Sequence, residues 1–319
     1  MTPNSPLVTV LLPAYNAAPY MKEAVDSVLA QTFKDFELLV INDGSTDGTG
    51  EILRSYTDER VWLVEQENMG LVRTLNKGIE LAKGKYIARF DADDVCYPDR
   101  LEVQMKFFQE HPDYIIVASE ADYMDEDGNF VFKYTFSHYE DEEIRASGLD
   151  SCPFIHSSVT VLRQALIDAG GYNDKAITFE DHLLWKNIAA FGKMKVQKLS
   201  LIKVRLNPSS ATIDERWRGK EFVELKERSI KNGDVSDEDF KTLVHILKSQ
   251  DFTEYKKAAY HSMLGKKYLW NQHKPRLARK HLREAIKHMP KKPEPYLLYL
   301  LSYLPGGLIE AIYHRGNRD

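Results

Sequence analysis

Short apolar runs alternate with amphipathic stretches through the first half of the chain. The runs are rich in branched residues and end at Pro, Gly, Asn or Asp, which is typical of buried strands. We predict strands at Leu7–Leu12, Phe36–Ile41, Val61–Val64, Tyr86–Phe90 and Tyr114–Ser119. Apolar residues at helical spacing predict helices at Ala18–Ala30, Thr49–Tyr56, Leu71–Ala82 and Arg100–Gln109. This alternation predicts an α/β fold with a mostly parallel, doubly wound sheet, whose first strand stops before Pro13.

The second half of the chain has a looser pattern. Phe130–Tyr134 and Val159–Arg163 read as antiparallel additions to the sheet, and Asp181–Phe191 as a helix. Leu199–Val204 reads as the last strand. Beyond about residue 215 the chain is charged and helical. We therefore predict an α/β domain over residues 1–215 and a helical C-terminal extension over residues 216–319.

The most apolar part of the tail is Tyr296–Ile312, which is followed by His314 and Arg315. Two interpretations are open for this stretch. It either packs back on the body of the protein, or lies on a membrane surface as a peripheral contact. The chain has no run of about 18 apolar residues, so we expect no transmembrane span.

Composition narrows the class of protein. Lys and Arg number 43 against 48 Asp and Glu, a formal charge of −5, so nothing favours nucleic acid as a partner. Cys96 and Cys152 are the only cysteines, and they show no zinc-ligand spacing. The N-terminus lacks the pattern of a secretory signal. We therefore expect a reduced, cytoplasmic location.

Polar clusters follow three of the predicted strands. They are Pro13–Asn16, Asp43–Asp47 and Asp91–Asp94. Ligands of open α/β sheets bind beyond the carboxyl ends of the strands. We therefore expect the three clusters to face one crevice.

The run Asp91-Ala92-Asp93-Asp94 carries the most distinctive chemistry. Three carboxylates in four positions repel one another unless a cation or a donor compensates them. Mg²⁺ and Mn²⁺ prefer oxygen ligands and commonly combine one or two carboxylates with phosphate oxygens. The functional interpretation is a metal–diphosphate site. The structural alternative is a solvated acidic turn with a helix-capping Asp.

The loop from Asp43 to Gly48 also opens like a calcium-binding loop. Its twelfth position, which would have to be Glu, is Arg54, so the calcium interpretation fails. No GxGxxG follows the first strand, and Tyr86 stands where a phosphate-binding P-loop needs Ser or Thr. These comparisons leave a tight turn or a different kind of nucleotide site.

Three segments in order and spacing resemble the family-2 glycosyltransferases. They are VTVLLPAYNAAPYMKEAVDSVLAQTFKDFELLVINDGSTDGT, NMGLVRTLNKGI and YIARFDADD. The resemblance covers about Leu7 to Arg205. It implies a GT-A fold, a nucleotide-sugar donor and transfer with inversion at the anomeric carbon.

The resemblance also implies roles for the donor-side residues. Pro13, Ala14, Tyr15 and Asn16 line the nucleotide pocket. Asp43 accepts a hydrogen bond from the base, commonly uracil N3–H, and Arg73 lies near the nucleotide. In Asp91-Ala92-Asp93, Asp91 approaches the ribose or the metal, and Asp93 coordinates the divalent cation, Mn²⁺ or Mg²⁺. Asp94 supports this turn. A carboxylate suits an N–H donor of uracil or guanine.

The acceptor side depends on the segment Thr178–Trp185. By resemblance Asp181 is the general base that takes the acceptor proton, with Glu180 as the second candidate. The structural alternative is a carboxylate in the first turn of a helix. Gly170–Asn173 resembles the family's turn near donor and acceptor, or is a helix C-cap. His156 is a candidate for substrate contact.

One departure concerns the end of the family domain. Lys203-Val204-Arg205-Leu206-Asn207 stands where many relatives carry a Tyr-Arg-x-His segment. Arg205 is still a candidate for phosphate contact, but Asn207 replaces the His and leaves a metal or phosphate role there in doubt.

The expected activity is transfer of a hexose or N-acetylhexosamine from a UDP-sugar to a saccharide or lipid-linked saccharide hydroxyl. The expected context is cell-surface polysaccharide synthesis, at a cytoplasmic or inner-membrane surface. Two alternatives stay open. A nucleotidyltransferase would carry a Gly-rich basic loop where this chain has Pro13–Asn16. A protein that only binds a nucleotide sugar would not need Asp93 and Asp181.

Overall fold

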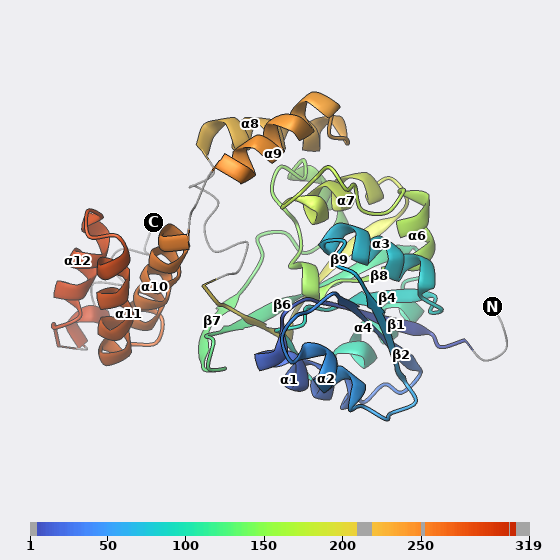
Figure 1. Cartoon of the computed structure of the whole chain (residues 1–319), viewed down its shortest axis with the longest axis horizontal. Helices are drawn as coiled ribbons and strands as arrows, with labels where there is room; N and C mark the ends of the chain where they lie inside the picture. Colours follow the sequence, from blue (N-terminus) through green and yellow to red (C-terminus); the bar gives the residue numbers. More distant parts are fainter. Residues whose placement is uncertain (1–4, 209–218, 250–252, 306, 311–319) are drawn as a thin grey trace. The chain divides into compact units, whose positions relative to one another are not determined.

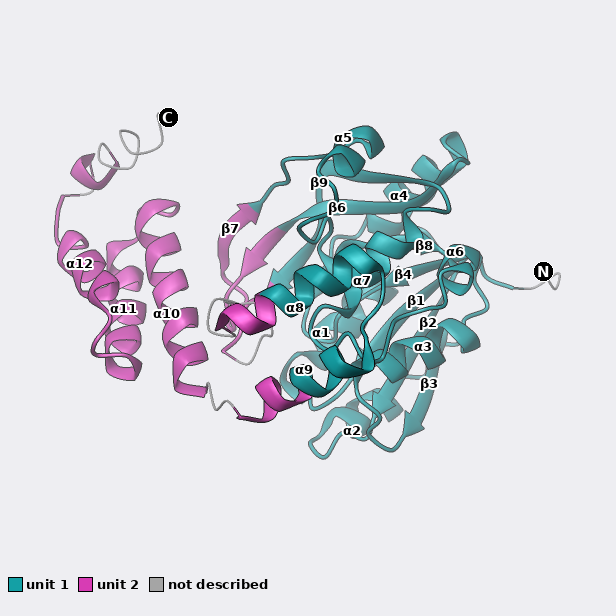
Figure 2. Cartoon of the chain, turned by 90° about the horizontal axis from the view of Figure 1, so that it is seen from above, with its two compact units in different colours: residues 1–121, 134–204, 224–243 teal, residues 122–133, 205–223, 244–319 magenta. Residues whose placement is uncertain are grey.

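The computed structural model describes residues 5–208, 219–249, 253–305 and 307–310. The chain forms two compact units (Figure 2). The first comprises residues 1–121, 134–204 and 224–243, and the second residues 122–133, 205–223 and 244–319. The boundary predicted at residue 215 lies outside the described residues. Part of the chain beyond that boundary, residues 224–243, belongs to the first unit.

A nine-stranded sheet forms the centre of the fold, in the order β3-β2-β1-β4-β8-β6-β9-β5, with β7 paired to β6. The strands β1 to β4 pair in parallel, which confirms the mostly parallel sheet expected from the sequence. The strands are β1 (Val8–Ala14), β2 (Phe36–Asp43), β3 (Val61–Gln66), β4 (Tyr86–Arg89), β5 (Val95–Cys96), β6 (Tyr114–Met124), β7 (Phe130–Tyr134), β8 (Thr160–Leu162) and β9 (Lys193–Arg205).

Strand β8 lies between β4 and β6 and runs antiparallel to both. Ala88 of β4 pairs with Thr160, and Val117 of β6 pairs with the same residue. The antiparallel addition predicted at Val159–Arg163 is therefore confirmed. It lies in the interior of the sheet, where both of its faces are covered. Val161 is 2% exposed, and Thr160 is fully buried.

Helices cover both faces of the sheet (Figure 1). Those of the first half are α1 (Ala18–Leu29), α2 (Thr49–Arg54), α3 (Leu71–Leu81) and α4 (Arg100–Glu110). Helix α3 packs on β1 and β2 through Leu75 and Ile79, which join Leu11 and Leu39 in one core. Gly78 permits this close approach, because a Cβ there would lie 2.3 Å from Leu11 Cδ1. An apolar stripe at helical spacing thus fixes the face of α3 that meets the sheet.

The first strand continues through Pro13 to Ala14, so the prediction that it stops before Pro13 is wrong. The pairing with β4 ends at Leu11↔Arg89, whereas the pairing with β2 continues to Ala14↔Asn42. Beyond Leu11 the strand is therefore a local edge. Proline is tolerated at a sheet edge because its missing N–H removes no ladder bond on the open side.

The remaining helices of the first unit follow the strands of the second half. They are α5 (Asp141–Ala146), the 3₁₀ turn η1 (His156–Ser158), α6 (Arg163–Asp168), α7 (Glu180–Ile188), α8 (Gly219–Asn232) and α9 (Asp237–Ser249), the last two shared with the second unit. The turn between α8 and α9 is held to the first unit by side chains. Asn187 Nδ2 donates to Gly233 O at 2.8 Å, and Asn173 Nδ2 donates to Asp234 Oδ1 at 2.7 Å.

The second unit is built around three helices, α10 (Thr253–Trp270), α11 (Pro275–His288) and α12 (Pro293–Leu301). Leu264, Tyr268 and Leu282 form its buried centre. The apolar stretch Tyr296–Ile312 contributes most of α12, but the helix ends at Leu301 rather than running through the stretch. Residues 306, 311 and 312, with His314 and Arg315, lie outside the described residues. None of the described helices combines the length and the apolarity needed to cross a membrane.

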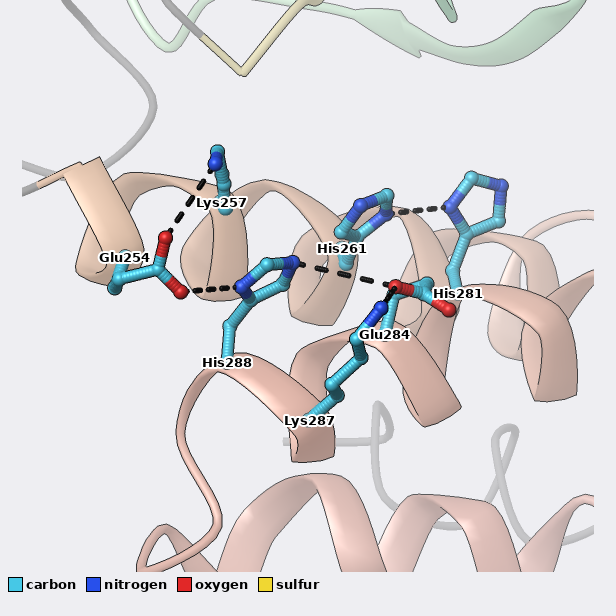
Figure 3. Close-up of polar contacts among 7 residues, drawn as sticks. All are labelled: Glu254, Lys257, His261, His281, Glu284, Lys287 and His288. Atoms are coloured by element: carbon cyan, nitrogen blue, oxygen red, sulfur yellow. Dashed lines mark hydrogen bonds and ion pairs between the residues drawn. The ribbon is translucent and has the colours of Figure 1, made fainter.

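Three histidines lie at the contact between α10 and α11 (Figure 3). His261 and His281 share a hydrogen bond between their Nδ1 atoms at 3.1 Å, so one ring donates and the other accepts. His288 Nδ1 bonds Glu254 Oε2 at 2.6 Å. Burial, and then the neighbouring His281, lower the pKa of His261 to about 4. Burial also lowers the pKa of His281, so both rings are neutral at pH 7.

Candidate functional site

The three polar clusters expected at the strand ends lie on adjacent strands. Ala14 at the end of β1 pairs with Asn42 of β2, and Asp43 pairs with Gln66 at the end of β3. Strand β4, whose last residue Arg89 pairs with Leu11, leads into Asp91. Because these strands are parallel, their carboxyl ends share one edge of the sheet. The structure thus places the predicted donor-side residues on neighbouring loops.

The loop after β1 is tied to the loop after β2. Asn16 has a φ of 49°, and its N–H donates to Ser45 Oγ at 3.0 Å. Its side-chain oxygen accepts from Thr46 N at 2.8 Å. Pro13 and Ala14 are buried beneath this loop, whereas Tyr15 is 53% exposed. Asn16 therefore shapes the loop, and Tyr15 is the member of the cluster whose ring is available for stacking on a ligand.

Asp43 is almost fully buried and organises the segment that leads from β3 to α3. Its Oδ1 accepts from Gln66 Nε2 at 2.7 Å and from Met69 N at 2.8 Å, and its Oδ2 accepts from Gly70 N at 2.9 Å. Burial opposes the charge of this carboxylate, but these bonds outweigh burial and lower its pKa. Asp43 is thus ionised at neutral pH.

The acidic run after β4 forms a turn before β5. Asp91 and Asp93 are half-buried, and Asp94 is 2% exposed. Asp91 forms an ion pair with Arg89, and Asp94 accepts a short hydrogen bond from Ser157 Oγ. The turn therefore offers the Asp91 and Asp93 carboxylates toward solvent, with Asp94 as its buried support.

A divalent cation fits this turn only with help from a ligand. In the part of the chain that the structure describes, no group of three His, Cys, Asp or Glu side chains is placed to hold a metal. Mg²⁺ commonly takes one or two carboxylates and completes its shell with phosphate oxygens and water. Asp91 and Asp93 suit that arrangement, in which a nucleotide diphosphate supplies further ligands.

Arg89, which sequence reasoning missed, lies at the centre of the site. Its side chain is 3% exposed, and its Nη1 is paired with Asp91. Its Nε has no hydrogen-bond partner among the described residues. Burial opposes its charge, but attraction first to Asp91 and then to further acidic groups, Asp94 among them, raises its pKa. Arg89 is therefore a fixed cation beside the acidic turn.

Glu180 and Asp181 form the first turn of α7, as the sequence predicted for the acceptor side. Burial, and then the neighbouring Asp181, raise the pKa of Glu180 to about 7, although Arg89 draws it down. Burial also raises the pKa of Asp181, which accepts from His182 N at 2.7 Å. A carboxyl group whose pKa is about 7, beside a second one whose pKa is also raised, is suited to proton transfer.

His156 joins the turn at residues 170–173 to this centre. Its Nε2 shares a 2.7 Å hydrogen bond with the Tyr172 hydroxyl, and its ring meets Trp185 edge-on. Burial, and then the charge of Arg89, hold the pKa of His156 well below its usual range. A neutral His156 therefore positions Tyr172 in the wall of the site. The glycines at 170 and 171 both have positive φ, as this turn requires.

Two predicted contact residues have other partners than the acidic turn. The Arg73 side chain is 63% exposed and lies 3.7 Å from Asp174. Arg205 is buried in the second unit, where its Nη1 donates to Glu126 O at 3.0 Å. Asn207 also belongs to the second unit. The structure thus uses Arg205 to hold a turn of the chain.

Cys152 is a second residue whose place beside the site the sequence analysis missed. In that analysis the cysteines served only to infer a reduced location. The Cys152 Sγ lies 3.6 Å from Asp181 Oδ2, as a donor to that carboxylate. Burial, and then the charge of Asp181, raise the pKa of this thiol well above its usual range. No sequence signal marks Cys152. Arg89 does have one, since it is a charged residue inside an otherwise apolar run just before the acidic turn.

Sequence comparison with known proteins identifies the family of this chain. The family model described as Glycosyl transferase family 2 matches residues 9–171. An uncharacterised glycosyltransferase of Methanocaldococcus jannaschii is 31% identical over 209 residues, which cover 64% of this chain and 72% of that protein.

Solved structures share the fold at low identity. S. aureus TarS in complex with UDP-GlcNAc has a TM-score of 0.54 and 18% identity, covering 97% of this chain and 92% of that one. The mannosyltransferase PcManGT from Pyrobaculum calidifontis, in complex with GDP-Man and Mn²⁺, has a TM-score of 0.52 and 19% identity over 97% and 84% of the two chains. Both support the GT-A type of fold for this chain.

Proposed function

The chain belongs to glycosyl transferase family 2, and we propose that it moves a hexose or N-acetylhexosamine from a UDP-sugar to a hydroxyl of a saccharide or lipid-linked saccharide. The observation that carries this proposal is the arrangement around Arg89. This buried cation is paired with Asp91 of the acidic turn and interacts with Glu180 at the start of α7. Arg89 thus lies between the acidic turn, which we propose binds the leaving diphosphate, and the carboxylate pair, which we propose supplies the base.

The donor is proposed from the chemistry of the strand ends. An ionised Asp43 and the exposed ring of Tyr15 provide a hydrogen-bond acceptor and a stacking surface for a base. Asp43 would accept a hydrogen bond from the N3–H of uracil. TarS binds UDP-GlcNAc and the Pyrobaculum enzyme binds GDP-Man, which supports a nucleotide sugar as the donor.

Asp93 is proposed as the metal ligand, with Asp91 beside it. When bound, Mn²⁺ or Mg²⁺ would neutralise the charge that develops on the leaving diphosphate. Arg89 holds Asp91 in place and adds a second positive charge at the same turn. The presence of Mn²⁺ in the complex of the Pyrobaculum enzyme supports a divalent cation here.

The base is proposed to be Asp181, with Glu180 as the alternative. The carboxylate removes the proton of the acceptor hydroxyl as its oxygen bonds to the anomeric carbon. At the same time the bond from that carbon to the diphosphate breaks, and UDP leaves with the electron pair. A single displacement of this kind inverts the anomeric centre. The raised pKa values of the pair support this role.

Thermal melting with nucleotides tests the donor proposal. We expect UDP with Mn²⁺ to stabilise the protein by about 2.7 kcal/mol at one hundred times its dissociation constant. GDP, CDP, ADP and NAD⁺ should give smaller shifts. The Asp93→Asn variant should lose the part of the UDP shift that depends on Mn²⁺. A larger shift with GDP than with UDP would indicate a GDP-sugar as the donor in place of a UDP-sugar. No shift with any nucleotide would contradict the proposal.

We also propose that the enzyme works at the inner face of a membrane, in cell-surface polysaccharide synthesis. The support is the surface around α12, where Leu297, Leu300 and Tyr303 are 59–67% exposed. Arg283 Nε donates to Tyr299 Oη at 2.9 Å, and Arg279 lies over the Tyr303 ring at 4.6 Å. Lys and Arg outnumber Asp and Glu by 12 to 3 between residues 253 and 308. Exposed leucines, tyrosines and basic side chains together suit an anionic lipid surface.

Vesicle sedimentation tests this contact. We expect the protein to sediment with vesicles of phosphatidylcholine and phosphatidylglycerol, less so in high salt, and not with phosphatidylcholine alone. The double variant Leu297→Ser and Leu300→Ser should weaken binding about tenfold or more, since each leucine contributes about 1.5–3 kcal/mol when fully buried in lipid. Phe191→Ser, an exposed apolar side chain of the first unit, is the control. Equal sedimentation of both variants would contradict the proposal.

A further inference from the structure

A polar pocket of about 860 Å³ lies in the first unit, on the outer side of α3. It is lined by Met69, by Arg73, Asn76, Lys77 and Glu80 of α3, by the turn at residues 169–174, by Asn187 of α7 and by the turn at Gly233 and Asp234. Its volume is in the range of small-molecule binding sites. The acidic turn, Glu180 and Asp181 do not line it. The pocket therefore lies beside the acidic turn and the carboxylate pair, and shares with the candidate site Tyr172 and Met69, whose N–H bonds Asp43.

The walls of the pocket are built by specific bonds. Asn76 accepts from Tyr172 N and donates to Tyr172 O, both at 2.8 Å, which fastens the 169–174 turn to α3. A Cβ on Gly171 would lie 2.6 Å from Asn76 Oδ1, so this position requires glycine. Lys175 Nζ donates to Asp237 Oδ1 at 2.7 Å and braces the start of α9. These bonds join three segments that are far apart in sequence into one cavity wall.

The pocket connects to both sides of the proposed reaction centre. Lys77 Nζ donates to Gln66 Oε1 at 2.7 Å, and Gln66 Nε2 donates to Asp43 at the same distance. On the other side, the Tyr172 hydroxyl is bonded to His156, whose pKa is lowered in part by Arg89. The bonded pair Asn76 and Tyr172 therefore belongs to the pocket wall, and its Tyr172 hydroxyl reaches His156.

The lining selects a neutral, hydroxyl-rich ligand. The side-chain amides of Asn76, Asn173 and Asn187 each hold a bond within the wall, and each amide has a second N–H and a second lone pair beyond that bond. The charged side chains are of both signs, with Arg73 and Lys77 near Glu80, Asp174 and Asp234. Mixed charges give no net attraction for a polyanion, and the polar wall disfavours a lipid chain. Saccharide hydroxyls match such a lining.

We propose that this pocket is a subsite for acceptor sugars that precede the reacting one. The inference rests on the proposed glycosyl transfer and deepens it, because it names an oligosaccharide rather than a single sugar as the acceptor. Asn187 is six residues beyond Asp181 on α7, or about 9 Å along the helix axis, a separation longer than one sugar ring. The α8–α9 turn completes the subsite through Gly233 and Asp234.

Saccharide binding measured by calorimetry and saturation-transfer NMR tests the subsite. The probes are tetrasaccharides and monosaccharides of glucose, galactose, mannose and N-acetylglucosamine. We expect at least one tetrasaccharide to bind at least tenfold more tightly than its monosaccharide. Glu80→Trp, which places an indole in the pocket from an exposed helix position, should remove this advantage. Glu110→Trp, at the exposed end of α4, is the matched control.

A second variant keeps the test decisive if the Glu80→Trp protein does not fold. Asp234→Ala removes a wall carboxylate and the bond to Asn173 without adding bulk. It should also reduce the advantage of the tetrasaccharide. If both variants keep it, or if no saccharide binds the wild-type protein, the subsite is overturned. UDP binding with Mn²⁺ is followed in the same samples. If the wild-type protein does not bind UDP with Mn²⁺, the proposed transferase activity is overturned instead of the subsite.

Discussion

Replacing Asp181 with Asn should reduce sugar transfer by about 10²–10⁴-fold, the usual contribution of a general base. Asn has nearly the same shape and keeps an oxygen for His182 N, which Asp181 accepts at 2.7 Å. It cannot take the acceptor proton. UDP affinity should stay within about twofold of the wild type, a free-energy change below about 0.5 kcal/mol. Initial rates with a radiolabelled donor and calorimetry with UDP measure the two effects.

Glu180→Gln is the matched comparison for the base. Glu180 has its pKa raised to about 7, so wild-type kcat/KM should rise with pH through about 7 as the carboxylate pair loses its proton. If Asp181 is the base, Glu180→Gln should retain transfer. The rising limb of the kcat/KM profile, here called the pH limb, should then move to lower pH, because a like charge beside Asp181 is removed. If Glu180→Gln abolishes transfer and Asp181→Asn does not, the roles of the two residues are reversed.

Replacing Arg89 with Met should lower kcat by about 100-fold or more, because removing one preorganised group that stabilises developing negative charge costs about 2.7–4 kcal/mol of transition-state stabilisation. The acidic turn would lose the cation paired with Asp91. Arg89 also lowers the pKa of Glu180, so the pH limb of kcat/KM should move above 7 in the variant. A purely structural role would lower the melting temperature without moving this limb.

Arg89→Lys separates charge from shape. Lysine keeps the positive charge but lacks the planar fork of donors that an arginine presents. We expect it to restore the position of the pH limb and only part of kcat. Thermal melting of both variants shows how much of the loss is due to unfolding. Wild-type rates and an unchanged pH limb in Arg89→Met would refute the central role of this residue.

The strands and the loops that follow them could be predicted because their signals are local. A buried parallel strand is a short continuous apolar run, and its end is marked by the residues that start a turn. Asp43 and Asp91 stand directly after such runs, and the structure places both at the same edge of the sheet. The helices between them followed from their apolar stripes. The extension of β1 through Pro13 was missed because an edge position depends on where β4 stops.

The partners of the site residues could not be predicted, because they come from distant parts of the chain. Asp43 is held by Met69 and Gly70, and Cys152 meets Asp181 across 29 positions. Strand β8 enters the sheet between β4 and β6, which pattern alone does not specify, since a three-residue apolar strand pairs equally well elsewhere. The order of strands is decided by how the whole sheet packs.

By itself, the sequence determined the α/β rhythm, the edge of the sheet that carries the candidate site and the carboxylates at that edge, because each depends on residues close together in the chain. Only the tertiary structure decided that Arg89 is the buried cation of the site, that Glu180 has a raised pKa, and that the α8–α9 turn belongs to the first unit. The physical reason is that burial and electrostatic fields depend on every neighbour in space. A sequence pattern reports only the neighbours along the chain.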